Sequence, residues 1–376
     1  MKIGIDASRA FLRRRTGIEE YSYQIIRHLR DELREDEVVL YVRKKIGFRD
    51  GRVQFFSPDI DFELPAHWRV KGLWAPRFWT QVRLSLEMLF AAPEALFVPA
   101  HTVPIIHPKR TIVTIHGLEY EFSPESYGLL ERVYMRWSIR HSVRTAWHVI
   151  TVSENTKRDV IRFYGTSEKK MSVIYEGVSI GNPASSIQHP ELISQFSITD
   201  SKYMLFIGRL ETRKNIIRII EAFEKFKNAT GLSHQLVLAG KPGYGYGNIR
   251  AKIQGSRFKS EIREVGYVTE EEKWQLLKNA EMFLFPSLYE GFGLPVIEAQ
   301  NMGIPVITSN VSSLPEISGE GVLLIDPLSP EDLAQAMEQL VKNLQKRADI
   351  IEIAFQNAGR FSWERCAREL KAQLVN

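Results

Sequence analysis

Residues 281–300, EMFLFPSLYEGFGLPVIEAQ, contain the pattern of a strand, a turn and a helix in immediate succession. The first six residues form a short apolar run that is typical of a buried strand. Pro295 suits the first position of a helix, and Gly291 and Gly293 leave backbone N–H groups unobstructed just before it. The pattern predicts a helix whose N-terminal end favours anions and hydroxyl-rich ligands.

Two acids, Glu290 and Glu298, lie eight positions apart in this stretch. Glu290 is expected on the turn and Glu298 on the helix. Two interpretations are open from the spacing alone. Either both acids bind one ligand at different depths, or they are solvated acids at an ordinary joint between a strand and a helix.

Apolar runs of strand length alternate with helical patterns along nearly the whole chain. The first series is KIGIDA (2–7), VVLYV (38–42), ALFVPA (95–100), TIVTIHG (111–117), HVITVS (148–153) and MSVIYEG (171–177). The second series is MLFIG (204–208), QLVLAG (235–240), EIREVG (261–266), EMFLFP (281–286), PVITSN (305–310) and GVLLID (321–326). The alternation predicts an α/β protein with two doubly wound, Rossmann-like parallel-sheet domains.

The boundary between these domains is expected at residues 179–201, which have loop composition and no strong period. The N-terminal domain would then span residues 1–178 and the C-terminal domain residues 202–359. Ligands of such sheets bind beyond the carboxyl ends of the strands. Functional residues are therefore expected on the loops that follow the strands, facing a cleft between the domains.

The composition, 44% hydrophobic and 25% charged over 376 residues, is that of a globular protein of two domains. Cys366 is the single cysteine, which excludes an intramolecular disulfide and fits a reducing compartment. No apolar run reaches the length of a membrane span, and the first residues lack the pattern of a signal peptide. We expect a cytoplasmic protein with peripheral membrane contact at most, at the inner face of the plasma membrane.

Charge is distributed unevenly between the two halves. Residues 1–190 contain 28 Lys/Arg and 22 Asp/Glu, whereas residues 191–376 contain 22 and 23. A basic first half predicts an anionic partner. Nucleic acid is not expected, because the chain has neither an RNP-type aromatic motif nor zinc-ligand spacing.

The stretch GRLETRKN, residues 208–215, follows one predicted strand and precedes a helix. It places Arg209 and Lys214 on one loop, which suits a diphosphate. A solvated basic turn is the alternative. The glycines of GKPGYGYGN, residues 240–248, lack the GxGxxG spacing and make a weak dinucleotide fingerprint, so the composition favours a mobile loop instead.

Four motifs occur together and in order: GRLETRKN, EGFGLPVIE (290–298), GIPVITSNVSSLPEI (303–317) and FSWE (361–364). In this the chain resembles the retaining glycosyltransferases of the group 1 family (family four), which have the GT-B fold. The likeness covers nearly the whole chain and is strongest after about residue 200. It implies that the last helix, residues 360–376, packs back on the N-terminal domain.

The resemblance also implies roles for individual residues. Glu290 would contact the hydroxyls of the donor sugar and Glu298 the nucleotide ribose, while Arg209 and Lys214 would hold the diphosphate as it leaves. His116 would meet the sugar at the reacting centre. The remaining donor-binding positions that it implies are Gly17, Gly291, Phe292, Gly293 and Leu294. An alternative for His116 is a core histidine at a strand end.

Two positions depart from the pattern of relatives, which often have a second glycine at Glu19 and an aspartate at Gly117. The family implies a nucleotide-sugar co-substrate and neither a cofactor nor a metal. Asp59 and Asp61 resemble a metal-binding DxD, but they lack its strand–loop context and are expected to be surface acids.

Two rival functions remain open at this point. A sugar-nucleotide epimerase would use the same architecture without an acceptor, and a catalytically silent subunit would only scaffold a polysaccharide complex. The paired motifs GRLETRKN and EGFGLPVIE favour a transferase. Similarity to mannosyltransferases of bacterial surface polysaccharides favours GDP-mannose as donor, before UDP-glucose or UDP-N-acetylglucosamine.

The acceptor is expected to be a glycan or a lipid-linked sugar. Arg13, Arg14 and Arg15 follow the first strand and are candidates for binding its diphosphate. Residues 67–86, HWRVKGLWAPRFWTQVRLSL, hold three tryptophans and four Lys/Arg without an acid, a mixture that suits a membrane surface. After Pro76 the apolar side chains Phe78, Trp79, Val82, Leu86, Leu89 and Phe90 would form one helical face. That face either packs on the core or contacts the membrane.

Overall fold

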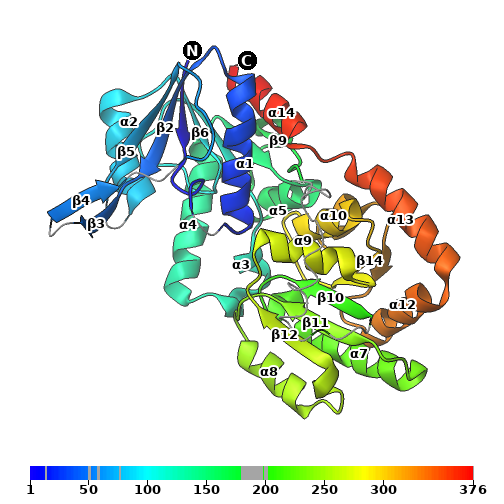
Figure 1. Ribbon diagram of the computed structural model, residues 1–376. Coiled ribbons are helices and arrows are strands. Elements are labelled where there is room, and N and C mark those ends of the chain that lie inside the picture. Colours follow the sequence, from blue (N-terminus) through cyan, green and yellow to red (C-terminus); the bar gives the residue numbers. More distant parts are fainter. Residues whose placement is uncertain are drawn as a thin grey trace. The chain divides into compact units, whose positions relative to one another are not determined.

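The computed structural model describes residues 1–12, 15–49, 52–56, 60–75, 78–178, 198 and 202–375 (Figure 1). The chain divides into two compact units. Unit 1 comprises Met1–Tyr120, Tyr127–Gly177 and Phe361–Asn376, and unit 2 comprises Glu121–Ser126 and Val178–Arg360. The predicted linker, residues 179–201, lies outside the described residues except for Ile198.

Unit 1 is built on a seven-stranded sheet in the order β5-β2-β1-β6-β7-β8-β9, in which every neighbouring pair is parallel. Its strands are β1 (Lys2–Asp6), β2 (Glu37–Arg43), β5 (Trp68–Leu73), β6 (Ala95–Val98), β7 (Arg110–Ile115), β8 (His148–Thr151) and β9 (Met171–Val173). The central strands are buried on both faces, which explains why they are continuous apolar runs rather than alternating ones.

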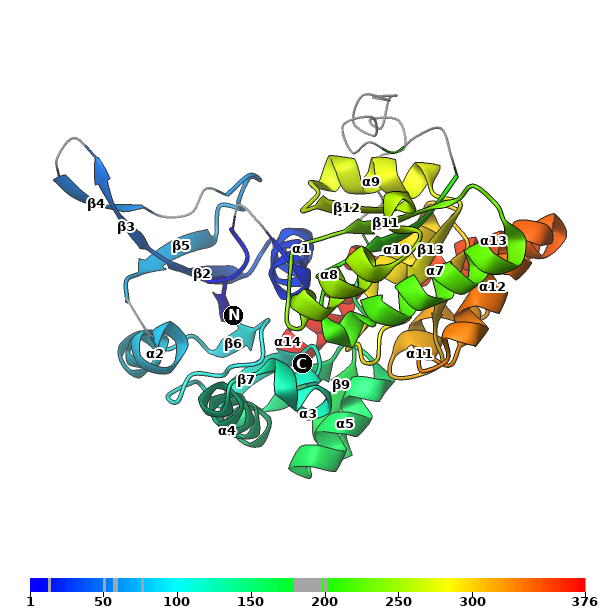
Figure 2. The same ribbon diagram turned by 90° about the horizontal axis from the view of Figure 1, so that it is seen from below.

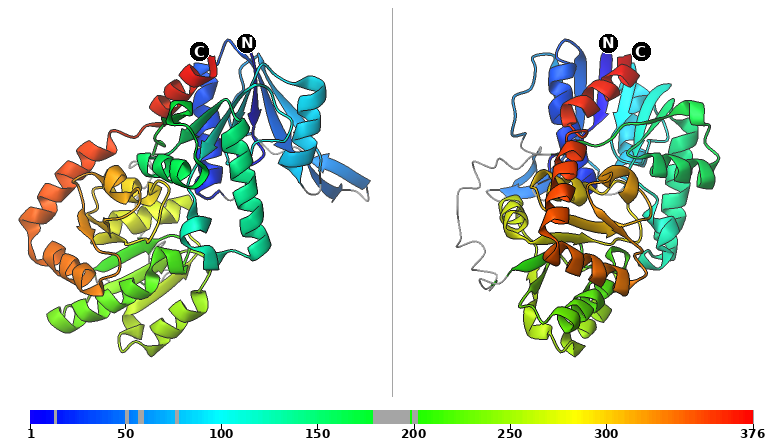
Figure 3. Two further views of the ribbon diagram at one scale, coloured as in Figure 1. Left: turned by 180° about the vertical axis from the view of Figure 1, so that it is seen from behind. Right: turned by 90° about the vertical axis from the view of Figure 1, so that its right-hand side faces the viewer.

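Helices cover both faces of this sheet. Crossovers between parallel strands are right-handed, so connections that step along the sheet in opposite directions place their helices on opposite faces. One face carries α1 (Gly17–Glu32) and the C-terminal α14 (Trp363–Val375). The other carries the π-helical turn Trp79–Leu84, α2 (Ser85–Ala91), α4 (Leu129–Thr145) and α5 (Glu154–Tyr164), as Figure 2 shows. Both termini therefore lie in unit 1, near each other (Figure 3).

Unit 2 contains a six-stranded parallel sheet in the order β12-β11-β10-β13-β14-β15. Its strands are β10 (Tyr203–Ile207), β11 (Gln235–Ala239), β12 (Ile262–Gly266), β13 (Met282–Phe285), β14 (Val306–Ser309) and β15 (Leu323–Ile325). Its helices are α7 (Ile216–Thr230), α8 (Tyr246–Gly255), α9 (Glu270–Asn279), α10 (Leu294–Asn301), α11 (Leu314–Ser318), α12 (Pro330–Lys342) and α13 (Leu344–Ala358). The short α3 (Glu119–Phe122) lies where the chain passes from unit 1 into the Glu121–Ser126 segment of unit 2.

All twelve predicted strands are present, and the fold class of two doubly wound parallel-sheet domains is confirmed. The antiparallel hairpin of β3 (Lys45–Arg49) and β4 (Arg52–Phe56) was not predicted from the sequence. In the described part of the chain, no helix combines the length and the apolar character needed to cross a bilayer.

The prediction that residues 67–86 contact a membrane requires a correction at Trp68, whereas Trp74 is exposed. Trp68 begins β5, is buried, and donates its indole N–H to the carbonyl of Leu33 at 3.1 Å. Trp79 is also buried and donates to the carbonyl of Leu73 at 3.2 Å. Both rings therefore belong to the core of unit 1 and cannot anchor the protein in a membrane.

Candidate functional site

The loops that follow β10 and β13 meet at the carboxyl edge of the unit 2 sheet. The chain leaves β10 through the 3₁₀ turn Thr212–Lys214, and Asn215 adopts a left-handed conformation with φ 64°. The Asn215 amide donates to the carbonyl oxygens of Pro286 at 3.0 Å and Pro327 at 2.6 Å. This buried asparagine therefore fixes the Lys214 turn against the loop that carries Glu290.

Lys214 and Glu290, two of the predicted site residues, form a buried ion pair. Arg213 joins the pair, with its Nη1 3.3 Å from Glu290 Oε1 and 2.6 Å from the carbonyl oxygen of Tyr289. Burial alone would raise the pKa of Glu290, but the Lys214 and Arg213 cations outweigh it and hold that pKa below its usual value. Glu290 is therefore an ionised, acceptor-only carboxylate.

The backbone around Glu290 is fixed by two serines of the GIPVITSNVSSLPEI motif. The Glu290 N–H donates to Ser312 Oγ at 3.0 Å, and Ser313 Oγ donates to the carbonyls of Glu290 at 2.9 Å and Phe292 at 2.7 Å. Gly293 caps α10 with φ 113°, a conformation that only glycine adopts without strain. Gly291 and Phe292 are buried beside it, and Leu294 opens the helix.

Glu298 lies one turn further along α10 and pairs with a lysine from another helix. Lys273 of α9 places its Nζ 2.7 Å from Glu298 Oε1 and 2.8 Å from Glu270 Oε2. Burial would lower the pKa of Lys273, but the two carboxylates outweigh it and raise that pKa above its usual value. Glu298 is therefore held in place as an ionised acceptor.

Arg209 lies on the same loop as Lys214 but is exposed. Among the described residues it has no ion-pair partner. The glycine-rich segment after β11 packs against this loop, with Gly243 N–H donating to the carbonyl of Leu210 at 2.9 Å. A Cβ at Gly243 would approach the Arg209 side chain to 2.7 Å, and one at Gly245 would approach Thr212 Oγ1 to 2.1 Å, so these two glycines allow close packing of the two loops.

In unit 1, His116 follows β7 and has a partner at each ring nitrogen. Nε2 lies 2.7 Å from the carbonyl oxygen of Pro99, and Nδ1 lies 3.0 Å from Glu176 Oε1. A carbonyl only accepts, so Nε2 carries a proton, and the Nδ1 contact needs a further proton on the ring or on the carboxylate. Tyr21 packs edge-on against the ring at 4.5 Å.

His101 was not predicted, yet it lies beside His116 with their ring centroids 5.3 Å apart. Its backbone is in the left-handed region with φ 44°, and its buried Nδ1 has no hydrogen-bond partner in the described part of the chain. Burial, together with His116 and Arg9, lowers the pKa of His101 well below its usual value. His101 is therefore a neutral imidazole with an unsatisfied ring nitrogen, and it lies next to the predicted site residue His116.

The remaining predicted positions of unit 1 have simple surroundings. Gly17 begins α1 with open space at its α-carbon. Glu19 accepts from the Thr16 backbone N–H at 3.2 Å, so this departure from relatives caps the helix. Arg15 pairs with Glu20 at 2.8 Å and stacks on Tyr23, whereas Arg13 and Arg14 lie outside the described residues.

Asp61 accepts a hydrogen bond from Tyr23 at 2.9 Å, and Asp59 lies outside the described residues. Over the described ranges, no three His, Cys, Asp or Glu side chains are grouped as metal ligands would be.

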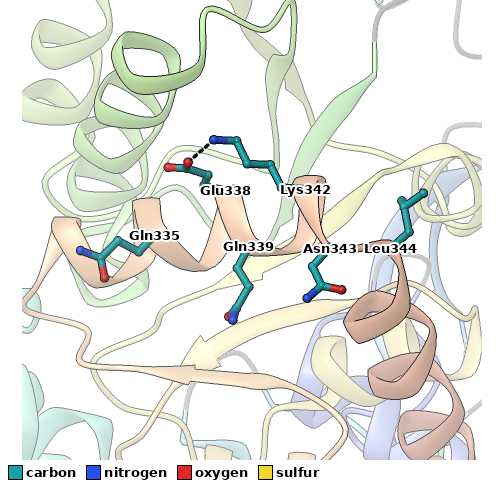
Figure 4. Close-up of a pocket in the computed structure, with 6 residues that line it drawn as sticks. All are labelled: Gln335, Glu338, Gln339, Lys342, Asn343 and Leu344. Atoms are coloured by element: carbon teal, nitrogen blue, oxygen red, sulfur yellow. Dashed lines mark hydrogen bonds and ion pairs between the residues drawn. The ribbon is translucent and has the colours of Figure 1, made fainter.

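A hollow on α12 and the start of α13 is lined by Gln335, Glu338, Gln339, Lys342, Asn343 and Leu344 (Figure 4). It contains none of the predicted site residues, and its ion pair joins neighbouring turns of one helix.

Comparison with known proteins agrees with this arrangement. The family model "Glycosyl transferases group 1" matches residues 189–357, and "Glycosyltransferase Family 4" matches residues 15–181. O-antigen chain mannosyltransferase B of Escherichia coli is 30% identical over 263 residues, which are 69% of each chain. The chain belongs to the group 1 glycosyltransferases of family four.

Other known proteins match over greater lengths. O-antigen chain mannosyltransferase RfbU of Salmonella typhimurium is 25% identical, with 93% of each chain covered. The structure of Anabaena HepE in complex with UDP and glucose has a TM-score of 0.72 at 17% identity, covering 100% of this chain and 99% of that one. WaaG, involved in lipopolysaccharide biosynthesis, has a TM-score of 0.72 at 13% identity over 100% of both chains. These similarities establish the GT-B fold of this glycosyltransferase.

Proposed function

We propose that this chain is a retaining, metal-independent hexosyltransferase that moves mannose from GDP-mannose to a glycan or lipid-linked acceptor in surface polysaccharide synthesis. The mannose assignment is supported by the O-antigen mannosyltransferases among its relatives. A nucleotide-sugar donor is also supported by the structure of HepE, which is a complex with UDP and glucose.

The observation that carries the proposal is the cluster of Arg213, Lys214 and Glu290 on adjoining strand-to-helix loops. Glycosyl transfer builds positive charge on the sugar and negative charge on the leaving diphosphate. The cations of the β10 loop, with Arg209 exposed beside them, would stabilise the leaving phosphate more strongly in the transition state than in the ground state.

The two glutamates would act as binding groups in this reaction. Ionised Glu290 accepts hydrogen bonds from sugar hydroxyls, and Glu298, held by Lys273, accepts them from the ribose. The depressed pKa of Glu290 makes it unsuited to donate a proton near neutral pH. His116, Gly17 and the turn at Gly291–Leu294 complete the proposed donor contacts, and Arg13–Arg15 those to the acceptor.

Incubation of the purified chain with a panel of nucleotide sugars tests the proposal. Slow hydrolysis of GDP-mannose, unchanged in EDTA and yielding the α-anomer first, is the expected result. Release of an epimer would identify an isomerase, and no turnover of any donor would leave a scaffold subunit. Loss of turnover in EDTA that manganese restores would contradict metal independence.

A further inference from the structure

The helical face predicted after Pro76 is exposed rather than packed on the core. Trp79 turns inward, but Phe78, Val82, Leu86, Leu89 and Phe90 lie on the outside of the π-helical turn and α2. The most exposed of these side chains is Phe90, at 82%. Side chains of this size rarely gather on a free surface without a partner.

A loop extends this apolar face towards α4. Ile106 donates its backbone N–H to Ser85 Oγ of α2 at 3.3 Å, and Val103 donates to Ser142 Oγ of α4 at 2.9 Å. The loop is thereby tied to both helices, which lie on the same side of the unit 1 sheet (Figure 2). Its side chains Ile105 and Ile106 are also exposed.

The exposed side of α4 continues the surface and adds charge. Val133, Trp137, Arg140 and Arg144 follow each other at spacings of four, three and four residues, which places them on one helical face, and all four are exposed. Trp137 stacks on His141 at 5.8 Å, and His141 Nε2 lies 3.3 Å from the carbonyl oxygen of Pro104. The aromatic and basic stripe of α4 therefore adjoins the loop.

Basic residues dominate around these apolar side chains. Helix α4 contains Arg132, Arg136, Arg140 and Arg144 but only one acid, Glu131. The one acid of α2, Glu87, is buried and already paired with Lys71 and Arg83. A second copy of the chain would bring the same cations against each other, whereas an anionic bilayer complements both the charge and the apolar side chains.

We propose that unit 1 docks on the anionic surface of a lipid bilayer through this α2–α4 surface, made by the exposed apolar side chains of residues 78–90, Ile105, Ile106 and the α4 stripe. It keeps the exposed side chains Phe78, Val82 and Leu86 of the segment predicted at residues 67–86, but not Trp68 or Trp79, which lie in the core. The docking itself does not depend on the proposed function. Its consequence, that the acceptor is carried by a membrane lipid, rests on that function.

Flotation of the full chain with vesicles tests the docking, using phosphatidylcholine alone or mixed equally with phosphatidylglycerol. The wild-type chain should float with the mixed vesicles only, and added salt should release it. Two variants, Leu86→Asp/Leu89→Asp and Arg140→Glu/Arg144→Glu, should each weaken binding by about tenfold or more. Matched controls in unit 2, Leu328→Asp and Arg257→Glu, also change exposed residues and should bind normally.

Thermal unfolding of each variant shows whether it is folded, and donor hydrolysis without acceptor reports on the donor site separately. Absence of wild-type binding, or equal binding by wild type and both variants, would overturn the docking. A dimer that Leu86→Asp/Leu89→Asp dissociates, without any vesicle binding, would make the surface an interface between copies. Normal vesicle binding without turnover of any donor would instead contradict the proposed function and leave the docking intact.

Discussion

Lys214 and Glu290 neutralise each other in a buried position, and this pairing connects two motifs that are 76 positions apart. The motifs themselves predicted both residues, because each follows a strand of the same parallel sheet. Arg213 and Lys273 were missed. Arg213 was indistinguishable from a solvated neighbour of Lys214, and Lys273 sits in an acid-rich helix far from any motif, so only the folded chain brings it to Glu298.

Substitution of either predicted phosphate-binding cation should slow turnover. Arg209→Ala and Lys214→Ala should each remove about 2–4 kcal/mol of transition-state stabilisation, which appears as a lower kcat. Lys214→Ala should also lower thermal stability, since among the described residues it leaves buried Glu290 paired with Arg213 alone. Arg209→Ala should not, because Arg209 is exposed.

Steady-state kinetics and thermal unfolding of both variants, with exposed Arg257→Ala as control, separate the two effects. Near-normal rates in both variants would remove the diphosphate role from this loop.

Glu298 should affect donor binding more than turnover. Glu298→Ala removes the acceptor assigned to the ribose, so the donor Kd should rise while kcat changes little. Lys273→Met leaves the carboxylate in place but frees it to move, and a smaller rise in Kd is expected. Titration calorimetry with GDP and GDP-mannose measures both constants. A fall in kcat without a change in Kd for Glu298→Ala would contradict the assignment.

At the level of the elements, apolar runs were sufficient to predict the strands, because strands buried on both faces have no polar alternation to obscure them. Edge strand β5 was missed, since Arg69, Val70 and Lys71 in its middle are exposed and two of them are charged, so it contains no apolar run. The spacing of residues 78–90 showed which side chains share a face. It could not show what covers that face, because burial depends on distant parts of the chain.

Glu281 joins several elements of unit 2 and should control its acid stability. This buried carboxylate contacts His234 at 2.8 Å, Arg347 at 2.9 Å and Lys202 at 3.1 Å. Burial would raise its pKa, but hydrogen bonds from His234 and Lys202 outweigh it and lower the pKa to about 2. The stabilisation is therefore complete above the unfolded pKa of 4.5 and is lost as the pH falls towards 2.

Glu281→Gln should lower the melting temperature at pH 7 and flatten its dependence on pH between 4.5 and about 2. Glu352→Gln, an exposed change on α13, is the control. Parallel pH profiles of wild type and Glu281→Gln would show that other carboxylates govern acid unfolding.

At the scale of the whole molecule, the C-terminal helix belongs to unit 1, although unit 2 precedes it in the sequence. Helix α14 returns to unit 1 and buries Trp363, Cys366, Ala367, Leu370 and Leu374 against the α1 side of the sheet. A Cβ at Gly177 would approach the Trp363 backbone to 2.2 Å, so the helix begins directly against the end of the preceding unit 1 segment.

Leu370→Ala leaves a cavity in this core and should destabilise unit 1 by about 2–5 kcal/mol. Arg368→Ala, an exposed change on the same helix, should have little effect. Calorimetry and limited proteolysis with fragment mapping provide the measurement: unit 1 should unfold at a lower temperature, with first cleavages in residues 1–177, while unit 2 keeps its own transition. An equal shift of both transitions, or cleavage beginning in unit 2, would show that α14 does not stabilise unit 1 in particular.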